Sequence, residues 1–132
     1  MRDAAIVRHR GKIEAAIANA RATLEVQDRY GSLAAMVWDF EPPRRGRQVP
    51  GRLGDLPAVT AESKALAKAL RRHGFRFVGP TTAYAAMESL GLINDHLWGC
   101  HVRVACNKDR QATDVPRSAT GIDRHAPGRA GP

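Results

Sequence analysis

Apolar residues recur at helical spacing along most of the chain. In its first part, Ile13, Ile17, Ala20 and Leu24 follow one another at intervals of four, three and four residues, which places them on one face of a helix. The residues at the very start of the chain run almost directly into this pattern, and none of them is placed to cap it. The sequence therefore predicts a first helix with an apolar stripe and without an N-terminal cap.

A second and shorter apolar segment has Leu33, Met36, Val37 and Phe40 at helical spacing, and it predicts a second helix. Residues 41–56 then contain three prolines and three glycines among four arginines. Because proline and glycine interrupt regular structure, this stretch predicts a mobile and basic loop.

Two more helices are predicted further along the chain. Thr60 is placed to cap a helix that extends through Arg71, and Glu62 in its first turn complements the helix dipole. The next predicted helix covers residues 80–90, because Gly91 is placed to end it. A short turn joins these two helices.

The C-terminal part is predicted to contain one short helix and then a tail. Asn94 or Asp95 can each cap that helix. Residues 107–132 consist mainly of Lys, Arg, Asp, Pro, Gly and Thr with hardly any large apolar side chain, so this basic tail is predicted to be disordered. Because the chain has no internal repeat and no strand-like alternation, the predicted fold class is all-α.

Composition and charge narrow the function. The 132 residues form one domain at most. With 21 basic and 13 acidic residues the net charge is +8, which suits a polyanion such as nucleic acid better than an anionic membrane surface. No signal peptide and no run of roughly 18 apolar residues is visible, which argues against a membrane partner. Two cysteines are too few for a disulfide-stapled secreted domain, so we expect a cytoplasmic protein.

The turn between the third and fourth predicted helices is the candidate DNA-binding site. Gly74 is placed to end one helix in a left-handed conformation, Gly79 permits a tight turn, and Pro80 suits the first position of the next helix. Free backbone N–H groups at that helix N-terminus favour an anion, and the basic side chains nearby make a nucleic-acid phosphate the expected one. The alternative is that this turn is an ordinary connection between two helices, whose charged side chains are solvated. The predicted DNA-binding residues are Gly74, Arg76, Val78, Gly79, Thr81 and Thr82.

Three blocks of sequence, at residues 6–20, 71–82 and 91–100, carry a family resemblance when taken together. On these blocks the chain resembles the DNA-3-methyladenine glycosylase I (Tag) family, a branch of the helix-hairpin-helix DNA glycosylases. The resemblance implies a partial glycosylase domain over residues 1–106, with its hairpin at residues 70–90, in a helical bundle truncated at the N-terminus.

The resemblance also exposes a gap. Family members carry a further N-terminal segment to which nothing here corresponds, so the chain is expected to begin in the middle of the domain. Either the gene product is truncated or its start codon is assigned too late. The resemblance implies that the missing segment supplies most of the pocket for the alkylated base, including its acidic residue. The catalytic residue of this chain is therefore unknown.

His96 and Cys100 stand four residues apart within residues 94–100, on one face of the last predicted helix. Imidazole and thiolate at that spacing can both reach one Zn²⁺, at about 2.0–2.3 Å. The resemblance implies that they form half of a structural zinc clamp, whose other Cys and His come from the N-terminal segment. Because a structural zinc ion binds four ligands, a site with only these two ligands is incomplete and binds zinc weakly. His101 and Cys106 could complete a local set, and a buried thiol beside a surface histidine is the remaining alternative.

Comparison with the wider superfamily of helix-hairpin-helix glycosylases implies which reaction the chain's family carries out. Asn94 falls where the superfamily has a catalytic Asp, and no Lys follows Pro80 in the second hairpin helix. Without that lysine there is no Schiff base and no strand-cleaving lyase step, so the resemblance implies a monofunctional N-glycosylase. For Asp95, the only nearby carboxylate, helix capping rather than catalysis is the expected role.

The function that the resemblance implies is DNA base-excision repair, in which 3-methyladenine is extruded from alkylated double-stranded DNA and released. Without the N-terminal segment, the chain alone is expected to be inactive. It is also expected to be marginally stable, because each large side chain left uncovered forfeits roughly 1.5–3 kcal/mol of a domain stability of about 5–15 kcal/mol. The alternative function is a non-catalytic helix-hairpin-helix DNA-binding module, or a remnant of the enzyme.

Other polar and aromatic residues receive simpler interpretations. Asn19 lies in an alanine-rich helix, where such a side chain usually bonds locally or faces solvent. Tyr84 is expected to be a packing residue of the fourth helix. Trp38 and Trp98 are expected to be core or interface aromatics.

Overall fold

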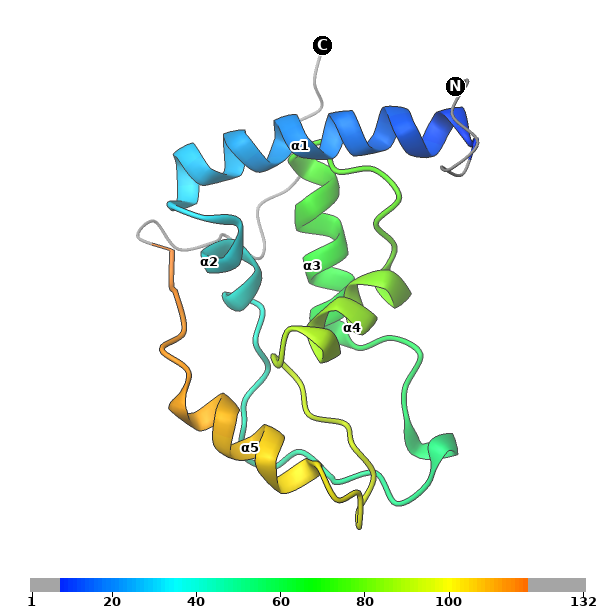
Figure 1. Ribbon diagram of the computed structural model, residues 1–132, viewed down its shortest axis with the longest axis vertical. Coiled ribbons are helices and arrows are strands. Elements are labelled where there is room, and N and C mark those ends of the chain that lie inside the picture. The colour runs from blue at the N-terminus through cyan, green and yellow to red at the C-terminus, as the bar shows by residue number, and fades with distance from the viewer. Residues whose placement is uncertain (1–7, 119–132) are drawn as a thin grey trace.

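The structure, a computed structural model, describes residues 8–118 and contains only helices, turns and loops over that range, which confirms the all-α prediction. Long α1 lies across one end of the molecule, α3 and α4 follow beneath it, and α5 lies toward the opposite end (Figure 1). The elements are α1 (Arg10–Tyr30), α2 (Leu33–Trp38), the short 3₁₀ helix η1 (Leu53–Asp55), α3 (Ala61–Arg72), α4 (Pro80–Ser89) and α5 (Arg103–Ala112).

The first helix has an N-terminal cap, so the prediction of an uncapped start is wrong. The helix begins at Arg10, and Nδ1 of His9 accepts a hydrogen bond from the backbone N–H of Lys12 at 3.2 Å. Histidine is not among the residues preferred at this position, which is why the sequence pattern did not reveal it. At the other end, Gly31 adopts a φ of 84° and its N–H donates to the carbonyl of Gln27.

The predicted apolar stripe of α1 is not its buried face. Ile17 and Leu24 are 52% and 63% exposed. The residues that α1 does bury are Ala15, Ala22, Val26 and Tyr30. This helix therefore has two apolar faces, and only one of them packs within residues 8–118.

One core cluster joins α1, α2, α3 and α4. Its fully buried members come from α1 to α4 and the segment after α4, and the largest are Met36, Leu66, Met87, Leu92 and Val26. The predicted cap of α3 is confirmed, since Oγ1 of Thr60 accepts from the N–H of Ser63 and Oγ of Ser63 accepts from the N–H of Thr60. Trp38 belongs to this core, whereas Trp98 is 79% exposed.

The C-terminal predictions need two corrections. Residues 94–100 form a loop with a turn and no helix, and the last helix is α5 instead. The predicted disorder from residue 107 is wrong at its start, because α5 continues to Ala112 and Arg117 donates to the carbonyl of Trp38 at 2.7 Å. The rest of the predicted tail, from residue 119, lies outside the described residues. None of the described helices has the length and apolar character needed to cross a bilayer.

Candidate functional site

Gly74 ends α3 in the left-handed conformation that the sequence predicts. Its φ is +83°, in the left-handed region that favours glycine, and its N–H donates to the carbonyl of Arg71 at 3.0 Å. The next N–H, that of Phe75, donates to the carbonyl of Leu70 at 3.1 Å. These two bonds make a Schellman motif, which fixes the direction in which the chain leaves α3.

The tight turn predicted at Gly79 lies two residues earlier. Gly79 is extended, with a φ of −98°, and serves as the N-cap of α4, with Pro80 following at the first helical position. The residue with a positive φ is Phe77, at +58°. A Cβ on Gly79 would meet only the Arg71 guanidinium, at 3.9 Å, so the lack of a side chain leaves the start of α4 uncovered.

The start of α4 presents backbone donors that find no acceptor in the described part of the chain. Within residues 8–118 the N–H groups of Val78, Gly79, Thr81 and Thr82 donate to no acceptor, and the first helical bond is from Ala83 to the carbonyl of Gly79 at 2.8 Å. These positions are exposed or half-buried. Since the N-terminus of a helix also carries a partial positive charge, this turn is suited to bind an anion.

Asn19 of α1 holds the turn in place. Its Oδ1 accepts from the N–H of Arg76 at 2.7 Å, and its Nδ2 donates to the carbonyl of Arg76 at 3.1 Å. Figure 1 shows the segment between α3 and α4 running beside α1. The prediction of a local or solvent-facing Asn19 is wrong, because its partner lies 57 residues away in sequence.

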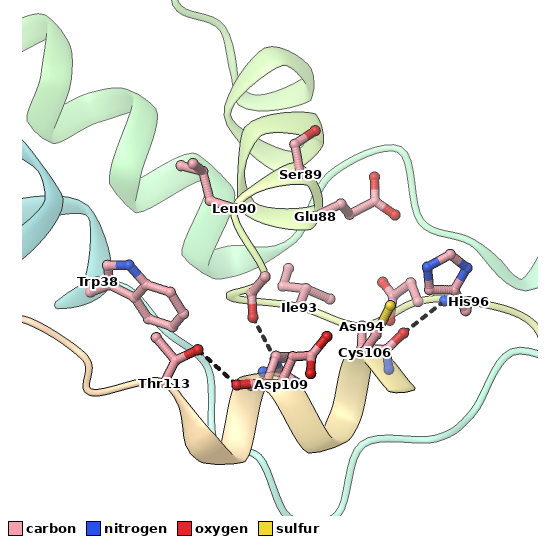
Figure 2. Close-up of a pocket in the computed structure, with 13 residues that line it drawn as sticks. Trp38, Glu88, Ser89, Leu90, Ile93, Asn94, His96, Cys106, Asp109 and Thr113 are labelled. Carbon is pink, nitrogen blue, oxygen red and sulfur yellow. Dashed lines mark hydrogen bonds between the residues drawn. The ribbon is translucent and has the colours of Figure 1, made fainter. Parts of the chain in front are cut away.

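A second feature is a pocket of about 650 Å³ between the end of α4, residues 91–96 and α5. Figure 2 shows Trp38 on one side of it and His96 on the other, with Ile93 and Asn94 between them. Three carboxylates line it, those of Glu88, Asp95 and Asp109. Burial, together with the charge of Asp95, raises the pKa of Glu88.

Asp95 does not cap a helix, contrary to the prediction. Its side chain is 4% exposed and accepts hydrogen bonds from Nη2 of Arg47 at 3.0 and 3.1 Å and from the hydroxyl of Tyr84. Burial and this carboxylate raise the pKa of Tyr84. Tyr84 is therefore buried, as expected, but it also bonds to the charged side chain next to the loop.

His96 and Cys100 lie together despite the absence of the predicted helix. Nδ1 of His96 and Sγ of Cys100 are 3.6 Å apart. No group of three possible metal ligands occurs in residues 8–118, so neither His101 nor Cys106 lies close enough to join this pair. The structure thus does not assemble the local four-ligand set that the sequence left open.

Residues 1–104 match the family model of the methyladenine glycosylases. The chain belongs to the methyladenine glycosylase family. It is 43% identical over 100 residues to DNA-3-methyladenine glycosylase 1 of Escherichia coli, and 39% identical over 100 residues to DNA-3-methyladenine glycosylase of Haemophilus influenzae. Each match covers 76% of this chain and 54% of the relative.

Solved structures share the fold of this methyladenine glycosylase family member. A crystal structure of 3-methyladenine DNA glycosylase I (TAG) has a TM-score of 0.68 and 45% identity, over 75% of this chain and 54% of that one. A TAG variant in complex with 3-methyladenine has a TM-score of 0.71 and 30% identity, over 78% of this chain and 55% of that one. The chain thus spans about half the length of the relatives that it matches.

Asn94, for which the sequence resemblance implied the position of a catalytic Asp, has a structural role in this methyladenine glycosylase family member. It is 8% exposed, and its Nδ2 donates to Oδ1 of Asn107 at 2.7 Å and to the carbonyl of Arg103 at 3.0 Å. Its Oδ1 accepts from the N–H of His96 at 3.3 Å. Because α5 supplies two of these partners, the amide fixes α5 to the loop that lines the pocket.

Proposed function

We propose that this chain acts in DNA base-excision repair, because two of its relatives are named DNA-3-methyladenine glycosylases. We also propose that α3, the turn and α4 form a helix-hairpin-helix contact with duplex DNA. The observation that carries the proposal is the row of unused N–H groups at the start of α4. Such groups bind phosphate oxygens without reading sequence. That suits a protein that must find damaged bases in any sequence.

The proposed contacts have different roles. The N–H groups of Val78, Gly79, Thr81 and Thr82 bind phosphate, and exposed Arg76 adds a positive charge beside them. Gly74 contributes conformation only, because its own N–H is already bonded to Arg71. Asn19 keeps the turn against α1, so that these donors face the DNA from a fixed position.

We propose that the pocket beside α4 is this chain's part of the site for the extruded base. Its volume of about 650 Å³ lies within the range of roughly 300–1,000 Å³ usual for small-molecule sites. The carboxylates of Glu88 and Asp109 outnumber Arg110, the one arginine of the lining, and so favour a cation. An N3-alkylated adenine is cationic before it leaves the sugar. Because α4 contains no lysine, the reaction would end at an intact abasic site.

The resemblance also implies a structural zinc ion, and the residues present fit half of such a site. Tetrahedral bonds of about 2.3 Å to sulfur and about 2.0–2.1 Å to nitrogen place the two ligand atoms roughly 3.5 Å apart. The 3.6 Å between Sγ of Cys100 and Nδ1 of His96 agrees with that separation. We propose these two residues as zinc ligands, with zinc fixing the loop at residues 94–103 and taking no part in the reaction.

The DNA contact is tested by a pair of substitutions at Gly79. Asp and Asn are both good N-cap residues, and the space around the Cβ position accepts either, so both variants should be at least as stable as the native chain. Only Gly79→Asp also places a negative charge against the phosphate. We expect it to weaken duplex binding about tenfold relative to Gly79→Asn, which is about 1.4 kcal/mol. If fluorescence anisotropy gives the two variants equal affinities for duplex DNA, the turn does not contact DNA and this part of the proposal fails.

The enzymatic part needs its own measurement. Duplex DNA that contains 3-methyladenine is incubated with the chain, and free base is quantified against a buffer control. Base release with uncleaved strands supports a monofunctional glycosylase and would overturn the expectation that the chain alone is inactive. Duplex binding without base release supports the alternative, a non-catalytic helix-hairpin-helix module.

A further inference from the structure

Phe77 is an exposed aromatic residue in the turn between α3 and α4. It is 59% exposed, and within residues 8–118 it is the only residue other than glycine with a positive φ, at +58°. Glycine adopts this conformation without steric cost, whereas an aromatic residue is strained in it. The aromatic residue therefore destabilises the turn through its backbone, and its small burial offsets little of that loss.

Contacts with the start of α1 fix the direction of this ring. The imidazole of His9 packs against it edge to face, with the ring centroids 6.2 Å apart and the planes at 88°. A Cβ on Gly11 would lie 3.9 Å from Cζ of Phe77, so the ring also lies beside a position of α1 that has no side chain. The ring is thus held along one side, while Phe77 as a whole stays mostly open to solvent.

The ring lies directly before the backbone donors that are proposed to bind phosphate. The N–H groups of Val78 and Gly79 follow it in the chain, and Arg76 before it is bonded through both backbone groups to Asn19. Along a DNA strand, the group next to each phosphate is a deoxyribose, whose carbon atoms are apolar. A strand whose phosphate is bound by these donors therefore brings a sugar close to the side chain of Phe77.

We propose that the ring of Phe77 packs against a deoxyribose of the strand whose phosphate the turn binds. The contact covers apolar surface on both molecules and involves no charge, so salt does not screen it and base sequence does not alter it. This contact accounts for a strained aromatic residue at a position where glycine would be more stable. The proposal rests on the proposed DNA contact of the turn and adds to it an apolar contact with the sugar.

Two substitutions remove the ring without straining the turn. Glycine and asparagine both tolerate a positive φ, so Phe77→Gly and Phe77→Asn should unfold at a denaturant concentration no lower than the native chain does. Each should bind duplex DNA about tenfold more weakly, as expected when roughly half of an aromatic side chain loses its cover. The slope of log affinity against log salt should not change, and calorimetry should give a less negative heat-capacity change of binding.

Two control variants accompany this test. Phe77→Tyr keeps the ring and should bind duplex DNA as the native chain does. Leu53→Asn removes an exposed apolar side chain of η1, which is 74% exposed, and should also leave the affinity unchanged. A loss of affinity in Leu53→Asn equal to that in Phe77→Asn would assign the effect to general apolar surface and overturn the proposal.

Four further results would overturn the proposal. Native affinity in both Phe77→Gly and Phe77→Asn would show that the ring does not touch DNA. A salt slope lowered by about 0.9 would mean that a phosphate contact was lost instead. A loss confined to some DNA sequences would place the ring against bases, and a lower unfolding midpoint in both variants would assign the ring to the fold.

The Gly79 pair distinguishes failure of this contact from failure of the proposed function. If Gly79→Asp and Gly79→Asn bind duplex DNA equally, the turn itself does not contact DNA. If those two variants differ as expected while the variants of Phe77 keep native affinity, the phosphate contact stands and only the sugar contact fails.

Discussion

Phe77 has a backbone conformation that a side chain normally avoids. Its φ of +58° costs a non-glycine residue of order 1–3 kcal/mol, so the residues on either side must hold it there. Asn19 binds both backbone groups of Arg76, and Nε of Arg71 donates to the carbonyl of Val78 at 2.9 Å. The strained residue thus lies between two anchored ones, directly before the N–H groups proposed to bind DNA.

The first prediction concerns Asn19. Asn19→Ala removes both bonds to Arg76, so we expect the free energy of unfolding to fall by about 1–2 kcal/mol. DNA affinity should fall as well, because the turn is no longer fixed. Denaturant unfolding and fluorescence anisotropy measure the two effects, and Gln27→Ala, at an exposed position of the same helix, is the control. Native DNA affinity in a destabilised Asn19→Ala variant would contradict the positioning role.

Single residues were predictable where the signal is local. The left-handed Gly74 and the cap at Thr60 follow from neighbours within a few positions, and both are confirmed. Asn19 and Asp95 were misjudged because their partners, Arg76 and Arg47, are 57 and 48 residues away. No spacing rule connects such pairs before the fold is known.

At the scale of elements, the ends of α1 and α3 meet through two side chains. The hydroxyl of Tyr30 lies 3.2 Å from Nε2 of His73, and the two rings pack edge to face with centroids 5.4 Å apart. Burial is the main cause that lowers the pKa of His73, and the nearby charges of Arg29 and Arg72 lower it further, against an opposing effect of Glu25. Folding therefore favours the neutral imidazole.

The second prediction is a loss of stability in mild acid. Because the pKa of His73 is lower in the folded chain than its usual 6.5, the unfolded chain takes up the proton first as pH falls. The free energy of unfolding should be constant with respect to this group above that value and decrease below it. His73→Gln should make the curve between pH 7.5 and 5.5 flatter. An unchanged slope in denaturant titrations would show that another group controls it.

The fifth helix was missed because it is held by hydrogen bonds rather than by burial. None of its residues is buried, so an argument that equates order with apolar cover predicts disorder there. Instead, the guanidinium of Arg110 donates to the carbonyls of Gly91 and Leu92, and one of its nitrogens lies 3.5 Å from Glu41. By contrast, the core helices α2, α3 and α4 were found from their apolar spacing and turn residues.

The third prediction tests that attachment. Arg110→Gln loses charged hydrogen bonds to two carbonyls, each worth about 1.5–3 kcal/mol, and should release α5 from the loop at residues 91–96. We expect faster proteolysis and faster amide exchange in α5, while α3 stays protected. Lys108→Gln, at an exposed position of the same helix, should change neither rate. Equal protection of α5 in the two variants would assign its stability to other contacts.

At the scale of the whole molecule, the exposed apolar face of α1 bears on stability. Ile17 and Leu24 are mostly exposed, so they contribute little to folding of the described chain. The chain also matches only 54% of its relatives' length. The sequence correctly identified this stripe as apolar and helical, but periodicity cannot tell which of two apolar faces the fold will cover. The expected marginal stability of the chain alone stays a prediction.

Net charge alone does not locate the proposed DNA contact. The loop at residues 41–56 is basic, as the sequence predicted, yet its Arg44 and Arg47 lie against Glu41 and Asp95. Arg52, although 85% exposed, is paired with Asp55 in η1. Because Glu41 is shared by Arg44, Arg110 and Arg117, these ion pairs compensate the positive charge of the loop only in part.

The last prediction separates a local contact from general attraction. If Arg76 neutralises one phosphate, Arg76→Gln should lower the slope of log affinity against log salt by about 0.9, uniformly across DNA sequences. Arg52→Gln removes the same charge far along the chain from the turn and should leave the slope unchanged, because that arginine already pairs with Asp55. Fluorescence anisotropy with duplex DNA at several salt concentrations gives both slopes. Equal losses would mean that the chain attracts DNA by its total charge, and the turn between α3 and α4 would then have no special role.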